Sequence, residues 1–542
     1  MDDPNGLLLL PLLLVFIVAS ATQRIAVALF LGCSAAAFVV SQGATLAGCQ
    51  LLLVQLMETT QLASCSSWEL FLEASNLQIS LFLAFMGILV VAIEESGSYR
   101  RFNELLVQQV RSRRHAEAAA ATFTQCLAID GYLATLTAGA AIRPLFDQLT
   151  LARIKLAYIA RCSSLATCSI NPISTWVALL LFQLHMSGIT RTASSQTLVL
   201  ADPFLIYVGL LPFAFYALLS LLVLWTIIFS GSSFGYMRFY ERGLNSSSTL
   251  CHDPTSSRAH AITPHLMDLL LPLGTMMGFT ALALFYTGGW SLLGGTHSFL
   301  ESLHHLDGAA SLFLGSLGAL LVYWVYLMAR RLISWRDLGR LSWRGGRLMA
   351  SSILVLNLVW TLIALEMYDG GLPNLVANTI PNLFPAFLLP FAFFLVALFF
   401  AGTIGSSWAT MTLLFPLATS SVVAFAGADV PLSLEQVPLL LPTLAAVVSG
   451  AVSGDQLSPL SDLNLVVCAT VSCSQKEHTT SQLSYSLPVV LATALAYLIS
   501  GGLASHSLWL ASSVSIGTAI AFLLAYLLFR HRRSQTQPIK TD

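Results

Sequence analysis

Two aspartates, Asp455 and Asp462, bracket a short polar run in an otherwise apolar part of the chain. Pro459 lies between them, and because proline donates no backbone hydrogen bond, it should interrupt a helix there. The interruption frees backbone carbonyls beside the hydroxyls of Ser458 and Ser461. Oxygen ligands of this kind are those that hard cations such as sodium prefer. A carboxylate in a partly dry site also accepts a proton more readily, so the sequence predicts a site where sodium and a proton compete.

Asp130 and Arg161 are two further ionisable residues inside apolar stretches. A charge at the centre of a bilayer costs at least about 2.5–3.5 kcal/mol, so each is a functional candidate by default. The simplest alternative is structural, in which the acids only pair with arginine or cap helix ends. We expect Asp130 to assist the two aspartates. For Arg161 three roles stay open: a counter-ion for an aspartate, a planar clamp for a substrate carboxylate, or a side chain that snorkels to the cytoplasmic interface.

These residues belong to a chain whose composition is typical of a membrane protein. Apolar residues make up 56% of its 542 residues and charged residues only 9%, against about 25% charged in soluble proteins. The mean hydropathy of +0.78 excludes soluble enzymes, nucleic-acid binders and disordered scaffolds. The formal net charge of −1 indicates no polyanionic partner. We therefore expect an all-α polytopic membrane protein whose main partner is the lipid bilayer.

Runs of about 20 apolar residues predict about 11–13 transmembrane segments. The candidate runs are 7–22, 25–41, 77–95, 116–140, 156–187, 204–229, 266–286, 309–328, 349–368, 387–425, 437–472, 482–500 and 508–529. Three of them are too long for one crossing and contain proline, glycine and serine. The predicted helix breaks are Pro172, Pro416, Gly454 and Pro459, together with the stretch 402–407. Broken or re-entrant helices are tolerated at membrane depth where they line a protein cavity.

Arginine and lysine are unevenly distributed among the loops, and this sets the expected orientation. They cluster at 100–114, 330–347 and 530–533, so these segments and the C-terminus should be cytoplasmic, with the protein in the cytoplasmic (inner) membrane. The segments 42–75 and 287–308 contain neither residue and should lie outside. Because the N-terminus is acidic, residues 7–22 are interpreted as a retained membrane helix and not as a cleaved signal.

The polar stretch 231–264 divides the chain into two comparable halves. The expected parts are N-terminal membrane helices with an outer segment (1–75), a first transporter repeat (76–230), a cytoplasmic linker (231–264), a second repeat (265–500), and a last membrane helix with a basic tail (501–542). Residues 133–137 resemble 408–412, and 171–175 resemble 458–462, in the same order and near helix breaks. The charge distribution would make the two repeats inverted, an architecture of secondary transporters with a midplane site.

The residues around the two aspartates also resemble a family motif. Residues 454–462, GDQLSPLSD, are similar to the G-D-x-x-S-P-[LI]-S-D signature of the NhaC-type sodium/proton antiporters. The resemblance covers residues 76–500, and its other runs are Gly405–Thr410 (similar to the family's G-T-S-W-G-T), Asp130–Leu133, Arg143–Asp147, Lys155–Ile159 and Pro172–Trp176. It implies an ion-transporter fold with inverted repeats and exchange of sodium for protons. Some relatives couple the ions to small carboxylates instead, such as malate against lactate.

Four positions depart from the family pattern. The family usually has a second Asp where this chain has Gly131 and an Asn at Ala134. It tends to have an Asp where this chain has Arg161 and a Lys at Gln456. The second-half site is therefore intact, while the first-half site has lost an acid and gained a base. The departures affect the expected stoichiometry and substrate more than the fold.

From the residues and the resemblance together we expect a secondary active transporter, not an enzyme, that exchanges sodium for protons by alternating access. Asp455 and Asp462 would bind either ion and form the sodium site. The other expected site residues are Asp130, Arg161, Ser174, Thr175, Ser407, Thr410, Ser458 and Ser461. The alternative is a cation- or proton-coupled exchanger of small carboxylates on the same scaffold. We expect no cofactor besides the transported ions and no nucleic-acid partner, and a homodimer is one assembly left open. The nine cysteines form no C-x-x-C pair, which disfavours a zinc site or a disulfide framework.

Overall fold

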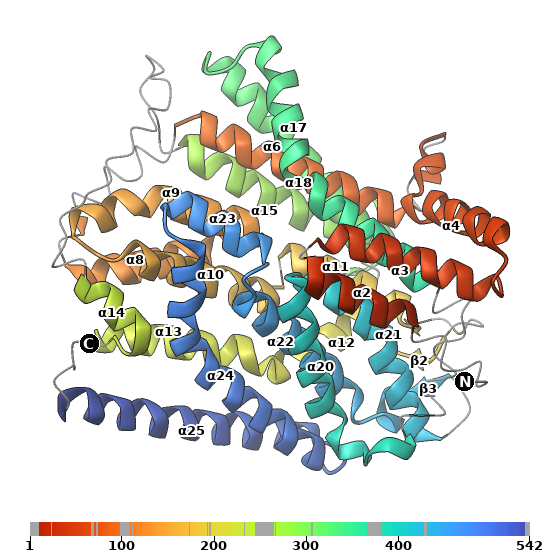
Figure 1. Cartoon of the computed structure of the whole chain (residues 1–542). Coiled ribbons are helices and arrows are strands. Elements are labelled where there is room, and N and C mark those ends of the chain that lie inside the picture. Colours follow the sequence, from red (N-terminus) through yellow and green to blue (C-terminus); the bar gives the residue numbers. More distant parts are fainter. Residues whose placement is uncertain are drawn as a thin grey trace.

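The computed structural model is an assembly of packed helices with one small sheet (Figure 1). It describes residues 10–536 apart from 23, 67–69, 72–73, 98–108, 111, 129, 173, 192, 194–196, 232, 244–264, 266, 305–306, 366–378, 380 and 428–430. Within this part, nine helical segments are long and apolar enough to cross a membrane. The prediction of an all-α polytopic membrane protein is confirmed.

Those nine segments are α6 (Ser75–Glu95), Phe215–Glu241 with α13 (Phe215–Ser230) and most of α14 (Gly235–Gly243), α15 (Met267–Thr287), α17 (Gly308–Ala329), α18 (Trp335–Ile363), Ala386–Ile404 with α20 (Leu389–Ile404), α21 (Ser407–Ala426), α24 (Gln475–Leu503) and Leu508–Phe529 of α25 (Leu508–Thr536). Four shorter apolar helices accompany them in the described residues: α2 (Leu10–Thr22), α3 (Ile25–Val40), α12 (Pro203–Leu210) and α23 (Asp462–Val471). The remaining longer helices are α4 (Thr45–Thr60), α8 (Arg113–Cys126), α9 (Gly131–Gln148), α10 (Arg153–Ile170), α11 (Thr175–Met186) and α22 (Leu440–Leu457).

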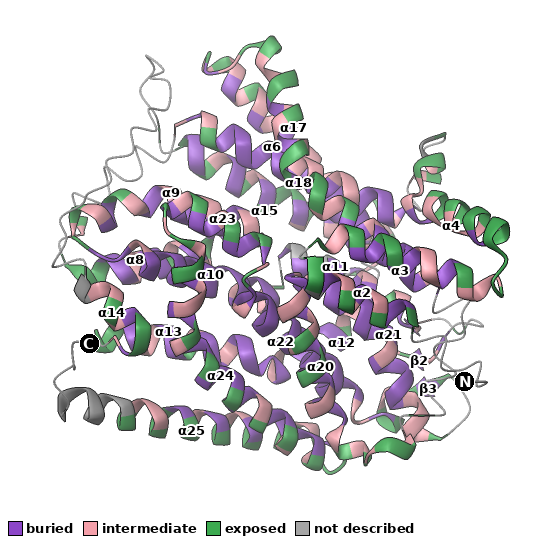
Figure 2. Cartoon of the chain, viewed as in Figure 1, coloured by how far each residue is buried: buried purple, intermediate pink, exposed green. Residues whose placement is uncertain are grey.

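Buried apolar side chains form three clusters. The central core joins α8–α14 with α20–α25. The α6 cluster joins α6, α15, α17 and α18, and the N-terminal cluster joins α2 and α3 to the end of α18 and the α20–α21 connection. Helices α10 and α22 lie inside the central core and are buried along almost their whole lengths (Figure 2). The functional residues predicted on these two helices are therefore far from lipid.

Each of the three overlong runs is divided at the predicted place. The chain turns between α10 and α11 at Asn171–Pro172, and between α22 and α23 at Ser458–Pro459. Between α20 and α21 it turns at Gly405, whose φ of 75° is a left-handed conformation that glycine adopts without strain. The helix breaks at Pro172, at Pro459 and in the stretch 402–407 are confirmed.

Two other predicted breaks are wrong, because Gly454 lies inside α22 and Pro416 lies inside α21. Gly454 serves packing instead: a Cβ atom there would lie 2.3 Å from the carbonyl oxygen of Leu398 on α20. Small residues let membrane helices approach closely in this way. Proline is tolerated inside membrane helices because neighbouring groups compensate the freed backbone carbonyl.

The run 116–140, which the sequence predicts as one helix, is divided between α8 and α9.

The order of elements is similar in the two halves of the chain. Helices α8 and α9 meet at a break, as do α10 and α11, and the pattern recurs in α20–α21 and α22–α23. At one end of the molecule a parallel sheet joins β1 (Ile189–Thr190), β2 (Val199–Leu200) and β3 (Leu432–Ser433), so it connects the two halves directly. The inverted relation between the halves and the domain limits stay predictions.

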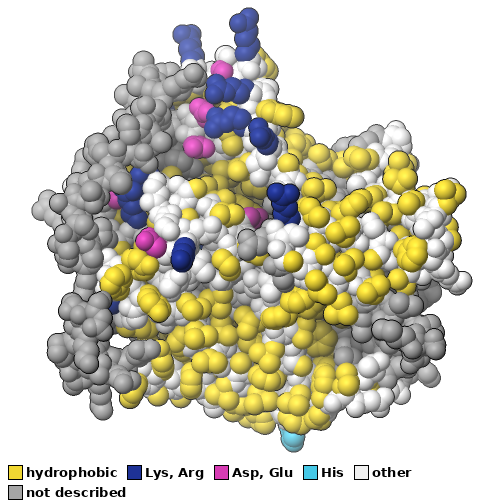
Figure 3. Space-filling view, viewed as in Figure 1, with side chains coloured by type: hydrophobic (Ala, Val, Ile, Leu, Met, Phe, Trp, Pro, Cys, Tyr) yellow, Lys and Arg dark blue, Asp and Glu magenta, His cyan; other side chains and the backbone are white. Residues whose placement is uncertain are grey.

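The basic segment 330–347 is largely helical, because α18 already begins at Trp335. Together with the end of α17, it projects from the top of the molecule in Figure 1. Basic side chains gather on this projection, whereas hydrophobic side chains cover the face near α20, α24 and α25 (Figure 3). This separation of charge from apolar surface fits a helix pair that leaves the bilayer at its basic end. Of the linker 231–264, α14 is described and 244–264 lies outside the described residues.

The close contact between α20 and α22 gives a test of the fold. A Cβ atom at Gly450 would lie 2.5 Å from the carbonyl oxygen of Phe394, so Gly450→Ala should force the helices apart. We expect the free energy of unfolding to fall by about 1–3 kcal/mol, measured by thermal unfolding of the detergent-solubilised protein. Gly502→Ala on α24 is the matched control, since no atom lies within 4 Å of its added Cβ. Equal stability of the two variants would contradict the α20–α22 packing.

Candidate functional site

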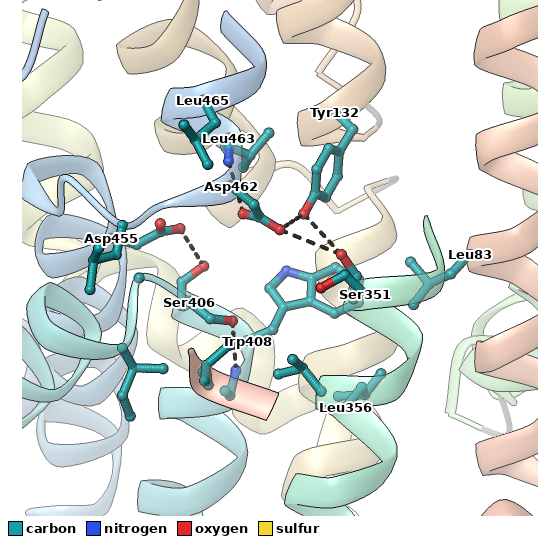
Figure 4. Close-up of a pocket in the computed structure, with 18 residues that line it drawn as sticks. Leu83, Tyr132, Ser351, Leu356, Ser406, Trp408, Asp455, Asp462, Leu463 and Leu465 are labelled. Atoms are coloured by element: carbon teal, nitrogen blue, oxygen red, sulfur yellow. Dashed lines mark hydrogen bonds between the residues drawn. The ribbon is translucent and has the colours of Figure 1, made fainter. Parts of the chain in front are cut away.

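A cavity of about 240 Å³ lies where the three apolar clusters meet. Its walls come from α3, α6, α9, α18, the α20–α21 connection, α22 and α23. Three of the expected site residues line it, namely Ser407, Asp455 and Asp462. Tyr132 and Trp408 point into it beside Asp462 (Figure 4). The α20–α21 and α22–α23 breaks therefore open onto one shared cavity.

Asp462 is the carboxylate most accessible from the cavity. It is the first residue of α23, directly after the capping residue Ser461, and the positive end of a helix dipole stabilises a negative charge there. Its Oδ1 accepts a hydrogen bond from the backbone nitrogen of Leu463 at 2.8 Å. Its Oδ2 accepts from the hydroxyl of Tyr132 and, at 3.4 Å, from that of Ser352 (Figure 4). Asp462 is thus held by neutral donors, and among the described residues no lysine or arginine forms a salt bridge with it.

Asp455 lines the same cavity but is buried in α22. Its Oδ2 accepts a hydrogen bond from the Oγ of Ser407 at 2.9 Å, across the break before α21. Its Oδ1 lies 3.2 Å from the Nη2 of Arg161, and the two side chains are only 3% and 0% exposed. A buried ion pair of this kind leaves little net charge. Asp455 therefore adds oxygen atoms to the cavity wall and little negative potential.

Arg161 lies behind the cavity wall and not on it. The Nε donates to the Oδ1 of Asn464 at 2.8 Å, and the Nη2 donates to the Oγ of Ser461 at 3.2 Å. These contacts fix the guanidinium between α10, α22 and α23, in the middle of the central core. The structure therefore excludes the snorkelling interpretation. Of the three roles left open by the sequence, the counter-ion role matches the contact with Asp455.

Five other expected site residues have described side chains that lie outside the cavity lining. Ser458 and Ser461 accept hydrogen bonds from the backbone nitrogens of Leu460 and Asn464 at the break. Thr410 donates to the carbonyl of Ser406 at 2.9 Å, Ser174 donates to the carbonyl of Cys168 at 2.7 Å, and Asp130 caps α9 by accepting from the nitrogen of Leu133 at 2.9 Å. Thr175 begins α11, and its side chain lies outside the description. Their contribution to ion binding stays a prediction.

Several residues of the site were not singled out from the sequence. Tyr132 and Trp408 stand inside two of the runs that resemble the family, so a signal for them was present. Asn464 lies two residues beyond the signature and donates to the carbonyls of Gln456 and Ser458, which stabilises the break. Ser352 lies on α18, and no pattern in the sequence pointed to it.

The arrangement suits a monovalent cation that is bound and released. Within the described parts of the chain, no group of three or more His, Cys, Asp or Glu side chains could hold a metal ion. The cavity instead offers the carboxylate of Asp462, the carboxylate of Asp455 that is paired with Arg161, and several hydroxyl oxygens. Such a donor set matches hard monovalent cations, and the same carboxylate can accept a proton.

Comparison with known proteins identifies a matching family and several relatives. Residues 167–502 match the sequence profile of the Na⁺/H⁺ antiporter family. The chain is 29% identical over 434 residues to an uncharacterized protein of Haemophilus influenzae, a match that covers 79% of each chain. It is 31% identical over 150 residues to an uncharacterized Na⁺/H⁺ antiporter of the same organism, covering 28% of this chain and 30% of that one.

Two further similarities are weaker. A malate-2H⁺/Na⁺-lactate antiporter of Bacillus subtilis is 27% identical over 189 residues, which cover 34% of this chain and 37% of the relative. Among solved structures, MtrF of Neisseria gonorrhoeae, described as illuminating a class of antimetabolite efflux pumps, aligns with 78% of this chain and 80% of its own. The TM-score is 0.44 and the sequence identity 13%.

The buried pair of Arg161 and Asp455 gives a second test. Arg161→Gln leaves Asp455 as a buried charge without its partner, which should lower the free energy of unfolding by about 3–5 kcal/mol. Asp455→Asn added to Arg161→Gln removes that charge and should recover most of the loss. Thermal unfolding in detergent at neutral pH measures both. A double variant no more stable than Arg161→Gln would show that the two charges do not depend on each other.

Proposed function

Because this chain belongs to the Na⁺/H⁺ antiporter family, we propose that it exchanges sodium for protons across the cytoplasmic membrane and that the cavity around Asp462 is the ion site. The chain is a multi-pass membrane transporter and not an enzyme. The observation that carries the proposal is that Asp455 and Asp462, predicted from one short motif, line a single cavity at the break between α22 and α23.

Sodium would bind through the oxygens that face the cavity. Asp462 supplies the negative charge, and the Oγ of Ser407 and the hydroxyl of Tyr132 lie beside the two carboxylates. Sodium is bound by oxygen ligands without a strict geometry, so hydroxyl groups can complete the site beside one carboxylate. Asp455 would contribute an oxygen whose charge Arg161 already balances.

A proton would compete with sodium for Asp462. The carboxylate faces the cavity and can accept either a proton or a cation there. Protonation removes the charge that holds sodium, and sodium displaces the proton. Exchange requires only this competition, provided that the site faces one side of the membrane at a time.

Alternating access would use the boundary between the clusters. The cavity is lined by Leu83 and Leu356 of the α6 cluster on one side and by Leu463 of the central core on the other. Movement of one group of helices against the other could open the cavity to either side, as in transporters built from broken helices. The basic segments 330–347 and 530–533 would stay cytoplasmic.

The carboxylate-exchanger alternative has less support from the geometry. That hypothesis needs the guanidinium of Arg161 to grip a substrate carboxylate. The guanidinium is fully buried, does not line the cavity, and is already paired with Asp455. The ionised groups that do line the cavity are Asp455 and Asp462, and Asp462 would repel an anion.

The proposed role of the carboxylates is tested by neutral replacements. Asp462→Asn should abolish sodium-driven proton movement in proteoliposomes, because it removes the proton site and the charge that holds sodium. Asp455→Asn should also cripple exchange, because it leaves the charge of Arg161 uncompensated beside the cavity. The control is Glu435→Gln, an exposed acid in the short helix Leu434–Gln436, which should exchange like the wild type. Wild-type rates for Asp462→Asn would refute the assignment of the site.

Competition between the two ions is a separate expectation. If sodium and a proton share Asp462, the apparent affinity for sodium must weaken as the pH falls, because protonated carboxylate does not bind the cation. The apparent KM for sodium is measured in proteoliposomes between about pH 6 and pH 9, a range on both sides of neutrality. A KM that stays constant over this range would contradict shared binding and favour separate paths for the ions.

A further inference from the structure

The cavity around Asp462 is larger than a sodium site requires. Its volume is about 240 Å³, whereas an apolar cavity of about 150 Å³ already accommodates a benzene molecule. A single sodium ion would occupy only a small part of this space. The cavity therefore has room for a small organic molecule next to the carboxylate.

Most of the cavity wall is apolar. The apolar lining residues are Ile25, Leu83, Val355, Leu356, Ile404, Ala409, Leu460, Leu463 and Leu465. These side chains offer no ligand to a metal ion. An alkyl group placed against them would gain about 25 cal/mol for each Å² removed from water. The wall thus favours cargo that carries hydrocarbon as well as charge.

The charge in the cavity is that of one carboxylate. Asp455 is paired with Arg161 at 3.2 Å, so these two charges and that of Asp462 sum to one negative charge. Among the described residues, no lysine, arginine or histidine lines the cavity. A monovalent cation is therefore the ligand that the electrostatics select, and an anion or a neutral molecule is not.

Two aromatic side chains lie beside that carboxylate. The indole of Trp408 projects into the cavity, and the phenol of Tyr132 donates to Asp462 (Figure 4). Aromatic faces near a carboxylate are a recurrent way to bind ammonium groups, and tryptophan is the strongest of them. Sodium gains little from an indole compared with oxygen ligands.

From this volume, wall, charge and aromatic pair, we propose that the cavity also takes small organic ammonium ions as cargo in place of sodium, with the ammonium group at Asp462 and Trp408 and the alkyl part against the apolar wall. The inference rests on the proposed function, since it assigns a second class of cation to the same exchange site.

Choline and tetramethylammonium are suitable probes because their fixed charge prevents them from crossing the bilayer as neutral bases. Each should inhibit sodium-driven proton movement in proteoliposomes competitively, raising the apparent KM for sodium without lowering the maximal rate. Each should also drive proton movement by itself. The neutral isostere of choline, 3,3-dimethylbutan-1-ol, should do neither, because it lacks the charge that Asp462 requires.

Replacement of the indole separates the two kinds of cargo. Trp408→Leu should raise the ratio of the choline inhibition constant to the sodium KM by about tenfold, because it removes the aromatic face that only ammonium uses. Trp408→Phe keeps an aromatic face and should recover part of the ratio. Trp509→Leu is the matched control, since Trp509 is 78% exposed on α25, away from the cavity. An unchanged ratio in Trp408→Leu would overturn the aromatic site.

The outcomes also separate the two proposals. Wild-type protein that exchanges sodium but is affected by neither ammonium ion would overturn the inference and leave the proposed function standing. If sodium exchange is absent, the thermal stability of the detergent-solubilised protein still reports on binding. Stabilisation by choline in the wild type but not in Asp462→Asn would then support the ammonium site while refuting sodium exchange, and no stabilisation would refute both.

Discussion

The buried ion pair between Arg161 and Asp455 is the constraint on which the site depends. Two charges removed from water must be paired closely and hydrogen-bonded, since either one alone would be strongly destabilising. Arg161 meets this condition by contacting Asp455 on α22, while Ser461 and Asn464 at the start of α23 accept from the same guanidinium. One side chain of α10 therefore fixes both sides of the α22–α23 break. The position of Asp462, next in sequence to Ser461, follows from that anchor.

The broken helices have a second physical role, because each break leaves backbone groups that need partners. At the α22–α23 break, the side-chain amide of Asn464 donates to the carbonyls of Gln456 and Ser458, and Ser461 caps the new helix. The break is thus satisfied internally, which a membrane protein requires where water is scarce. The carboxylate of Asp462 takes no part in bridging the break and faces the cavity. Asn464 and Ser461 stabilise the break, and Asp462 faces the cavity. The break can therefore be stable without using the carboxylate.

Local chemistry made part of this site predictable. Asp455, Asp462 and Pro459 stand within eight positions, so a polar break flanked by acids could be inferred from residue types and spacing alone. From the sequence, the partner of Arg161 could be limited only to a few aspartates. Which one it contacts depends on how α10 packs against α22. Ser352 lies 110 residues from Asp462 in the sequence and belongs to no motif. Its contact with Asp462 therefore becomes visible only in the tertiary packing of α18. The predicted helix breaks at Gly454 and Pro416 were wrong because a membrane helix tolerates both residue types in its interior. Glycine allows close helix packing, and the backbone groups that proline frees find other partners.

Arg161 also determines how many charges the site must balance. An acid at this position, as the family pattern has it, would place a third negative charge beside Asp455 and Asp462, and several cations would be needed to neutralise the cavity. With Arg161 paired to Asp455, the three ionised groups sum to a single negative charge. Under the proposed exchange, one sodium ion, one proton or one ammonium group would then be enough to neutralise the cavity before it opens to the other side of the membrane. A neutral cavity crosses an apolar boundary at the lowest electrostatic cost, so under the proposed exchange the departure at Arg161 would change the number of ions carried and leave the proposed site in place.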